Sequence, residues 1–351
     1  MTAAAPLWPD LIPQFQPWIG QVRGQLIPNQ LLGEMTTLRV GGPAQLFFRP
    51  ADEDDLSYFL RHLPEDIRLT VIGLGSNLLI RDGGLDGVVI RLPAKTFGSI
   101  EILDGHRVRV GTAVPDVKVA TAAAEAGIDG LWFYRGIPGG IGGALYMNAG
   151  CYKTETMDRM VELRAVLRNG DIVTLKHADM GYRYRKSNGP RGAIFTSAIY
   201  QGFPGDPETI LTEMRTVTER RESSQPTRAK TAGSTFKNPQ GHSSWKLIDD
   251  AGGRGFTFGR AQMSEMHSNF LINMGEADAF DVETVGETIR QKVRDKHGIE
   301  LRWEVRRMGH FVPGREVREF MDGAPFTGAE YSTEPRGIRS PLVSFPCSRS
   351  R

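Results

Sequence analysis

A glycine-rich run between residues 136 and 143 constrains the fold of this chain more than any other feature. Five of the eight residues from Gly136 to Gly143 are glycine. Residues without a Cβ let the backbone adopt positive φ angles and approach a ligand closely, which exposes successive N–H groups to an anion such as a diphosphate. A flexible linker would instead be padded with serine, threonine and charge. Apolar residues surround these glycines: Ile137, Pro138, Ile141, Ala144, Leu145 and Met147. The run therefore favours a phosphate-binding loop over a linker.

Length and composition are those of an ordinary globular protein. The 351 residues are enough for two domains with tails, and the net charge of +2 gives no electrostatic footprint for nucleic acid. Cys151 and Cys347 are far apart, and the seven histidines show no metal-site spacing, so we expect neither a disulfide framework nor a metal. The N-terminus lacks the basic region of a signal peptide and an uninterrupted apolar stretch, so no membrane span is expected. These features favour a cytoplasmic location.

Local patterns predict a mixture of helices and strands. Helices are expected over residues 52–63, 114–126, 207–221, 243–251 and 280–296. Strands are expected over residues 45–49, 69–73, 88–92, 108–110, 269–273 and 301–306. Two apolar runs flank Asn169-Gly170, which predicts a hairpin over 161–175 with a type I′ turn. Ordered structure is expected to begin near Thr36.

A second glycine loop, Gly73-Leu-Gly-Ser-Asn77, follows a predicted strand and begins like a dinucleotide fingerprint. The third glycine position is Leu78, and the following residues leave no room for the helix that such a fingerprint requires. Alone, this loop is compatible with an ordinary tight turn. Together with the run at 136–143, it indicates that the chain binds a dinucleotide.

Two other polar residues have more than one interpretation. Ser234-Thr-Phe-Lys237 has the Ser-x-x-Lys spacing of penicillin-binding enzymes, but Asn238-Pro239 disfavours the helix that this motif needs. Ser234 is therefore either a hydroxyl presented on a loop or a plain turn residue. Glu304 lies in an expected strand, where it is either solvated or directed into a cleft.

Seven segments, in this order along the chain, resemble one family of flavoenzymes, the UDP-N-acetylenolpyruvoylglucosamine reductases. They are residues 36–42, 73–79, 136–143 with 148–150, 184–187, 233–239, 261–270 and 304–306. Together they span roughly residues 34–310, and the set is far more specific than any one segment. The uninterrupted hairpin region resembles the shorter, type II branch of the family.

The resemblance implies an α+β fold and a domain order. An FAD-binding domain of the vanillyl-alcohol-oxidase (PCMH) type, in two subdomains, would precede a smaller α+β substrate-binding domain. We accordingly expect an N-terminal lead over residues 1–33, the FAD-binding domain over 34–204, the substrate-binding domain over 205–312 and a disordered tail over 313–351. The tail has no counterpart in the family.

The resemblance also implies the reaction. NADPH would reduce non-covalently bound FAD, which would then reduce UDP-N-acetylglucosamine enolpyruvate to UDP-N-acetylmuramate, a precursor of peptidoglycan. Neither a histidine nor a cysteine other than Cys151 stands near a flavin-linking position. The enzyme would act in the cytoplasm on a small-molecule substrate, without nucleic acid or a membrane span, as a monomer or weak dimer.

Site residues follow from the matched motifs. The resemblance implies that Ser234 is the proton donor and that Arg185 and Glu304 act on the substrate carboxylate and the charge developed there. Residues implied to contact FAD are Gly73, Gly75, Ser76, Asn77, Pro138, Gly139, Gly142, Gly143 and Asn148. Residues expected to contact the substrate are Tyr184, Lys237 and Asn238. The chain departs from the family at Lys153, where a glycine is expected.

Two rival functions are compatible with parts of the sequence. An FAD-dependent oxidase of the same cofactor fold would pass electrons to oxygen, but it predicts neither the Ser234 loop nor Glu304. A non-catalytic nucleotide-binding protein is suggested by Lys153 and the unmatched tail.

Overall fold

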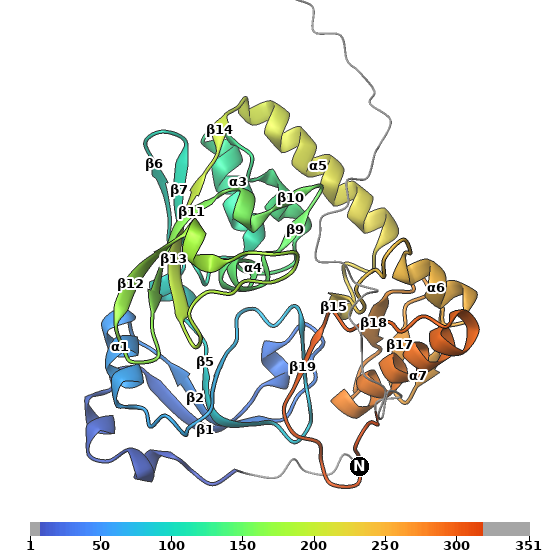
Figure 1. The fold of residues 1–351 in the computed structure, drawn as a ribbon, viewed down its shortest axis with the longest axis horizontal. Coiled ribbons are helices and arrows are strands. Elements are labelled where there is room, and N and C mark those ends of the chain that lie inside the picture. The colour runs from blue at the N-terminus through green and yellow to red at the C-terminus, as the bar shows by residue number, and fades with distance from the viewer. Residues whose placement is uncertain (1–7, 319–351) are drawn as a thin grey trace, which may run out of the picture.

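The computed structural model describes residues 8–318, in which three β-sheet regions surround the middle of the molecule (Figure 1). The first is a four-stranded sheet of order β1-β2-β5-β3, in which β1 runs antiparallel to β2 while β2 and β3 run parallel to β5. Its elements are β1 (Gln25–Leu31), β2 (Pro43–Arg49), β3 (Leu69–Val71), β5 (Leu85–Ile90) and helix α1 (Glu53–His62). The sheet and α1 pack through a shared apolar core that includes Phe48, Phe59 and Val88.

The second region is a five-stranded antiparallel sheet of order β12-β11-β13-β7-β6. Its strands are β6 (Ile100–Leu103), β7 (Arg107–Gly111), β11 (Met160–Val166), β12 (Ile172–Lys176) and β13 (Ile194–Gln201). The helical segments packed in its core are α3 (Asp116–Glu125), η4 (Trp132–Gly136), α4 (Ile141–Met147) and α5 (Pro207–Ser224). Helix α5, yellow in Figure 1, leads from this region to the third.

The third region is a small antiparallel sheet with two helices. The sheet has the order β15-β18-β17-β16. Its elements are β15 (Lys230–Ser234), α6 (Ser244–Asp250), β16 (Thr257–Phe258), β17 (Ala261–Met263), β18 (Phe270–Asn273) and α7 (Ala279–His297). After α7 the chain returns toward the first region, where β19 (Arg306–Met308) pairs in parallel with β4 (Leu78–Ile80). The last strand therefore lies directly beside the segment that follows the Gly73 loop.

Short elements complete the described chain. They are η1 (Ile12–Phe15), η2 (Trp18–Gln21), η3 (Gly33–Met35), α2 (Ala94–Phe97), β8 (Ile128–Asp129), β9 (Gly150–Cys151), β10 (Thr154–Glu155), η5 (Thr156–Asp158), η6 (His177–Met180) and β14 (Phe203–Pro204).

The five predicted helices are confirmed as α1, α3, α5, α6 and α7, and their ends carry the expected signals. Asp52 caps α1 by accepting a hydrogen bond from the Asp55 N–H at 2.9 Å. Gly127 and Gly298 follow α3 and α7 with φ of 66° and 68°, the left-handed conformation that ends a helix at little steric cost. These helices form where local capping and apolar spacing agree with the tertiary structure.

Two local predictions are wrong. The hairpin of β11 and β12 forms, but Asn169 does not have the positive φ that a type I′ turn requires. Its side-chain oxygen instead accepts the Asp171 N–H at 3.0 Å, which stabilises a longer loop. The strand expected over 301–306 begins only at Arg306, because the residues before it bond to the Ser234 loop through isolated contacts.

Ordered structure begins well before Thr36. Phe15 is fully buried and stacks on Trp18 with ring centroids 5.1 Å apart. Strand β1 then adds an edge to the first sheet.

From Pro313, the expected tail is described only to residue 318, and Arg315 there contacts Asp278 with its Nη1 2.5 Å from Oδ2. Residues 319–351 lie outside the described part of the chain. No helix among residues 8–318 is long and apolar enough to cross a membrane.

Candidate functional site

The two glycine loops meet face to face. A Cβ placed on Gly139 would lie 3.4 Å from Ser76 Oγ, and one on Gly140 would lie 3.4 Å from the Leu74 side chain. The loop at 136–143 is fixed from behind, since the Ile141 N–H donates to the Val114 carbonyl at 3.0 Å. The absence of side chains on Gly139 and Gly140 therefore allows the two loops to approach each other.

The loop over residues 73–77 presents backbone donors. Within the described chain, none of its N–H groups donates a hydrogen bond to another residue. Gly75 has a φ of 69°, and the space around the Cβ positions of Gly73 and Gly143 is open. Partly buried N–H groups are ordinarily paired. The row of N–H groups of residues 73–77, which lies beside the second glycine loop, is therefore suited to an anionic ligand such as a diphosphate.

Asn148 ends the helix that begins in the second loop, and its side chain is fully buried. Its Nδ2 donates to Glu155 Oε2 at 2.7 Å and to the Arg183 carbonyl at 3.1 Å, while its Oδ1 accepts the Met157 N–H at 3.0 Å. All of its polar atoms are thus used within the protein. The structure places Asn148 as an organiser of the segment between the loop and Arg185.

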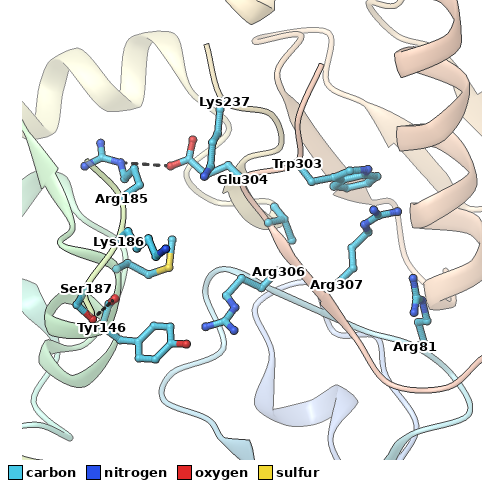
Figure 2. Close-up of a pocket in the computed structure, with 12 residues that line it drawn as sticks. Arg81, Tyr146, Arg185, Lys186, Ser187, Lys237, Trp303, Glu304, Arg306 and Arg307 are labelled. Atoms are coloured by element: carbon cyan, nitrogen blue, oxygen red, sulfur yellow. Dashed lines mark hydrogen bonds and ion pairs between the residues drawn. The ribbon is translucent and has the colours of Figure 1, made fainter. Parts of the chain in front are cut away.

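A cleft of about 570 Å³ opens between the second and third regions (Figure 2). It is lined by Arg81, Tyr146, Met147, Arg185, Lys186, Ser187, Lys237, Trp303, Glu304, Val305, Arg306 and Arg307. Arg185, Glu304 and Lys237 are predicted site residues that the structure brings together here. Ser234, Tyr184 and Asn238 do not line the cleft. Tyr184 and Asn238 are the sequence neighbours of Arg185 and Lys237, and Ser234 stands three residues before Lys237.

Arg185 is held between two carboxylates. Its Nε lies 3.5 Å from Glu304 Oε1, and its Nη1 lies 3.6 Å from Glu155 Oε1. Its Nη2 also donates to the Gly150 carbonyl at 2.8 Å. Figure 2 shows the guanidinium facing the Glu304 carboxylate across the cleft. These contacts fix a planar group of donors, the geometry that binds a carboxylate in two-pronged fashion.

The ionisable groups around Arg185 are partly desolvated. Burial raises the pKa of Glu304, and the positive charges of Arg185 and Lys237 oppose that increase. Burial lowers the pKa of Lys237, and the charge of Glu304 opposes that decrease. A carboxyl group in this setting is suited to hydrogen bonding in either protonation state.

Ser234 lies at the end of β15, beside the peptide that holds Glu304. The carbonyl of Thr235 accepts the Glu304 N–H at 2.8 Å. On the other side of the loop, the Asn269 amide accepts the Phe236 N–H at 3.0 Å and donates to the Phe236 carbonyl at 2.8 Å. The expectation that Ser234 lies on a loop or turn is wrong: Ser234 is the last residue of β15 and pairs with Phe270 of β18, one residue before the Thr235 carbonyl that bonds to Glu304.

The glycine loop and the cleft are joined by Asn77. Its Nδ2 donates to the Glu304 carbonyl at 3.2 Å, and its own carbonyl accepts the Arg306 N–H at 3.0 Å. Beyond it, Leu78 pairs with Arg306 in the parallel ladder of β4 and β19. The loop that offers backbone donors and the segment that runs from Glu304 into β19 are consequently one hydrogen-bonded unit.

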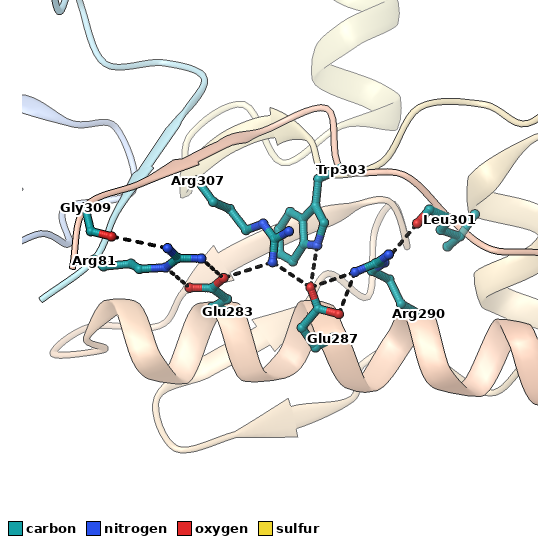
Figure 3. Close-up of polar contacts among 8 residues, drawn as sticks. All are labelled: Arg81, Glu283, Glu287, Arg290, Leu301, Trp303, Arg307 and Gly309. Carbon is teal, nitrogen blue, oxygen red and sulfur yellow. Dashed lines mark hydrogen bonds and ion pairs between the residues drawn. The ribbon is translucent and has the colours of Figure 1, made fainter. Parts of the chain in front are cut away.

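A buried charge network anchors the same strand to α7 (Figure 3). Arg81 grips Glu283 with two hydrogen bonds of 3.0 and 2.9 Å, and Arg307 bridges Glu283 and Glu287 at 2.9 and 2.7 Å. The indole Nε1 of Trp303 donates to Glu287 Oε1 at 2.7 Å. The Glu283 and Glu287 side chains are only 1% and 6% exposed, so removing the arginines that pair with them would leave buried carboxylates without counter-charges.

Several cleft residues escaped sequence reasoning. Arg306 was detectable, since it stands two residues after Glu304 and side chains at that spacing share one face of an extended segment; its guanidinium lies 4.8 Å from the Tyr146 ring centre. Glu155, which contacts both Arg185 and Asn148, follows no recognisable motif. The ion pairs of Arg81 and Arg307 could not be predicted, because their partners on α7 lie at least 20 residues away in the sequence.

Lys153, which stands where the family has a glycine, has a strained backbone conformation. Tyr152 and Lys153 have φ of 51° and 65° in the tight turn between β9 and β10, which is where the absence of a glycine costs free energy. Cys151 precedes them with its Sγ 3.0 Å from the Phe133 carbonyl. Burial raises the pKa of Cys151 to about 11, so the thiol is a poor nucleophile at neutral pH.

Comparison with known proteins defines the class first. Residues 44–176 match the FAD binding domain family, and residues 225–308 match the C-terminal domain of UDP-N-acetylenolpyruvoylglucosamine reductase. The chain is thus an FAD-dependent oxidoreductase with an α+β fold, and its cradle of free N–H groups fits the diphosphate of FAD.

Whole-chain relatives define the family. Enzymes named UDP-N-acetylenolpyruvoylglucosamine reductase from Methylorubrum populi and Methylorubrum extorquens are each 57% identical over 288 residues, covering 82% of this chain and 93% of theirs. The crystal structure of the enzyme of that name from Thermus caldophilus superposes with a TM-score of 0.69 and 34% identity, covering 80% of this chain and 98% of that one. The chain belongs to the UDP-N-acetylenolpyruvoylglucosamine reductase family, which confirms the resemblance seen in the sequence.

Replacing Gly286 by alanine tests the anchoring of Trp303 on α7. A Cβ on Gly286 would lie 2.1 Å from Trp303 Cη2, so the indole beside Glu304 must move. We expect a loss of about 1–3 kcal/mol in the free energy of unfolding and a shift in tryptophan fluorescence, both measured during urea denaturation. Gly20→Ala is the matched control, because no atom lies within 4 Å of its Cβ position. Equal stability of the two variants would contradict the anchoring.

Proposed function

We propose that this chain reduces UDP-N-acetylenolpyruvoylglucosamine to UDP-N-acetylmuramate with NADPH, through FAD, in the synthesis of peptidoglycan precursors. Membership of the reductase family carries the proposal, since both its FAD-binding and its C-terminal domains are matched. The direct bonds from Asn77 to Glu304 and Arg306 support it, because they link the dinucleotide cradle to the cleft in which a second ligand would react.

The glycine loops would hold FAD without a covalent bond. The free N–H groups of residues 73–77 would donate to its diphosphate, and Ser76, Gly139, Gly142 and Gly143 would lie along it. When bound, FAD accepts a hydride from NADPH and delivers it to the enol ether. The high pKa and the hydrogen bond of Cys151 support a non-covalent site, because its thiol is poorly activated for attack on the flavin.

Arg185 would bind the carboxylate of the enolpyruvyl group. Reduction of the vinyl carbon pushes negative charge toward that carboxylate, and a fixed guanidinium stabilises charge where it develops. Its existing contacts with Glu304 and Glu155 are long, at 3.5 and 3.6 Å, so the fork of donors can be shared with an incoming anion. Glu304 would hold Arg185 in place and hydrogen-bond to the same group.

Ser234 would donate its hydroxyl proton to the adjacent carbon of the substrate. Serine is a weak acid, so its contribution depends on position, which the pairing of Ser234 with Phe270 and the bonds of Thr235 and Phe236 to Asn269 fix. General-acid groups contribute roughly 10²–10⁴-fold to a reaction rate. Thr235, the residue after Ser234, accepts the Glu304 N–H at 2.8 Å, which holds the segment of the hydroxyl beside the segment of Glu304.

Three further residues would contact the remainder of the substrate. Lys237 lines the cleft and would meet the diphosphate of the UDP-sugar. Asn238 uses its Oδ1 to accept the Ser244 N–H at 2.9 Å, which leaves its NH₂ group for the same diphosphate. Tyr184 is 46% exposed beside Arg185 and offers an aromatic face.

We place the enzyme in the cytoplasm, where NADPH and nucleotide sugars are available, and expect a monomer or a weak dimer. Analytical ultracentrifugation over a range of protein concentrations measures the oligomeric state.

The proposed function is tested with the purified protein. We expect a yellow protein with flavin absorption bands, all of whose colour passes into the supernatant on acid precipitation. NADPH should bleach the flavin, and only the enolpyruvyl substrate should restore its colour rapidly without oxygen. Rapid reoxidation by oxygen alone would favour an oxidase, and a colourless protein would favour a nucleotide-binding protein without redox activity.

Replacing Ser234 by alanine removes the proposed proton donor with little change in volume. NADPH should still bleach the flavin at a nearly normal rate, because that step needs no proton from Ser234. Reoxidation by the substrate should slow by about 10²–10⁴-fold, measured by stopped-flow absorbance. Ser234→Cys should recover part of the rate, since a thiol also donates a proton. Reoxidation of Ser234→Ala at the parent rate would show that Ser234 has only a structural role.

Replacing Arg185 by lysine should impair the same step. An ammonium group cannot reproduce the two-pronged contact with a carboxylate, so substrate reoxidation should slow much more than reduction by NADPH. The two half-reactions are again followed by flavin absorbance, with exposed Arg183→Lys as the matched control. Equal slowing of both halves in Arg185→Lys would place Arg185 in cofactor binding.

A further inference from the structure

Asp116 is a buried carboxyl group that nothing in the proposed reaction uses. It is the first residue of α3 and is completely inaccessible to solvent. Neither of its carboxyl oxygens has a hydrogen-bond partner among the described residues. An acidic residue at the start of a helix ordinarily accepts the free N–H groups of that helix, so its orientation here calls for another explanation.

The carboxyl group faces the point where the two glycine loops meet. A Cβ on Gly139 would lie 2.8 Å from Asp116 Oδ2 and 3.4 Å from Ser76 Oγ, so both groups lie against the same side of Gly139. The backbone is tied to the same place, because the Asp116 N–H donates to the Gly139 carbonyl at 2.9 Å. Asp116 is therefore attached to one loop and lies on the same side of Gly139 as the hydroxyl of the other, with no hydrogen bond between the two groups in this structure.

The surroundings of Asp116 favour its neutral form. Burial raises the pKa of Asp116 well above 3.8, and none of the cations among residues 8–318 pairs with it. The titratable groups that face it from η4, β13 and β9 are Tyr134, Tyr200 and Cys151, whose pKa values its negative charge would raise further. All three are neutral near pH 7. An ionised Asp116 would have no counter-ion, and it would repel a diphosphate bound to the adjacent loops.

We propose that Asp116 is a positioning residue of the FAD site: when FAD is bound, the neutral acid donates its carboxyl proton to Ser76 and so holds the two glycine loops at the spacing that the diphosphate requires. This inference rests on the proposed function, in that the cradle binds FAD. It adds a residue from outside both loops and makes the retention of FAD depend on a proton.

The sign of the pH dependence follows. The neutral form supports the cradle, so the affinity for FAD should fall as the pH rises and Asp116 loses its proton. Asparagine has the same shape, remains neutral at every pH and keeps an N–H donor. Asp116→Asn should therefore retain FAD at pH 7 and lose the alkaline weakening, whereas Asp116→Leu should weaken FAD binding about five- to tenfold, the range of one neutral hydrogen bond.

The experiment measures release of FAD from the purified holoenzyme on dilution, followed by the rise in flavin fluorescence, between about pH 6 and about pH 9. Asp82→Asn is the matched control: Asp82 is a half-buried aspartate whose pKa burial also raises, but its carboxylate accepts the Ala279 and Phe280 N–H groups at the start of α7. This control should keep the pH dependence of the parent protein. Thermal melting of each apoprotein reports the stability of the fold separately.

Three results would overturn the inference: equal loss of FAD from Asp116→Asn and Asp116→Leu, parent affinity in Asp116→Leu, or parallel pH profiles of the parent and Asp116→Asn. If Asp116→Leu does not fold, the pH profile of Asp116→Asn against the parent decides alone. A parent protein that binds no FAD would refute the proposed function instead, and the variants would then not be compared.

Discussion

The parallel pairing of β4 with β19 is the contact on which the organisation of the site depends. It brings the end of the described chain back to the segment that follows the first glycine loop, and Asn77 extends the pairing by bonding to Glu304 and Arg306. Without this pairing, the loop that offers donors to a diphosphate and the segment that carries Glu304, just before β19, would belong to separate regions. The chemistry of reduction requires the two ligands to meet, and the return of the chain makes that possible.

The charge network on α7 supports this return. Glu283 and Glu287 lie one turn apart on the helix and bind Arg81, which follows β4, and Arg307 of β19. Buried ion pairs of this kind add little net stability but penalise any arrangement that leaves one charge unpaired. The network therefore fixes where the third region sits against the first, and with it the width of the cleft. Trp303 transmits the same constraint to Glu304, its neighbour in the chain.

Much of the site could be predicted from the sequence, for physical reasons that differ by residue. The glycine loops were recognisable because a closely approached backbone needs residues without side chains, and that need is written in composition alone. Helix ends such as Asp52 and Gly298 were predictable because capping is local. Arg185, Ser234 and Glu304 were predicted as site residues through family motifs rather than physics, since an isolated glutamate in a strand is more often solvated.

The sequence by itself determined five of the helices, the hairpin of β11 and β12, several further strands, the two glycine loops and the family, because these depend on neighbours within a few residues or on motifs kept in order. Only the tertiary structure decided what lies against what. Strand β1 joins the first sheet, and Glu155 forms an ion pair with Arg185. Arg81 and Arg307 form ion pairs with α7, and the buried Asp116 lies against Gly139. Each of these contacts joins residues that are far apart in the chain, and their free energy comes from burial and charge pairing that exist only once the regions have packed together.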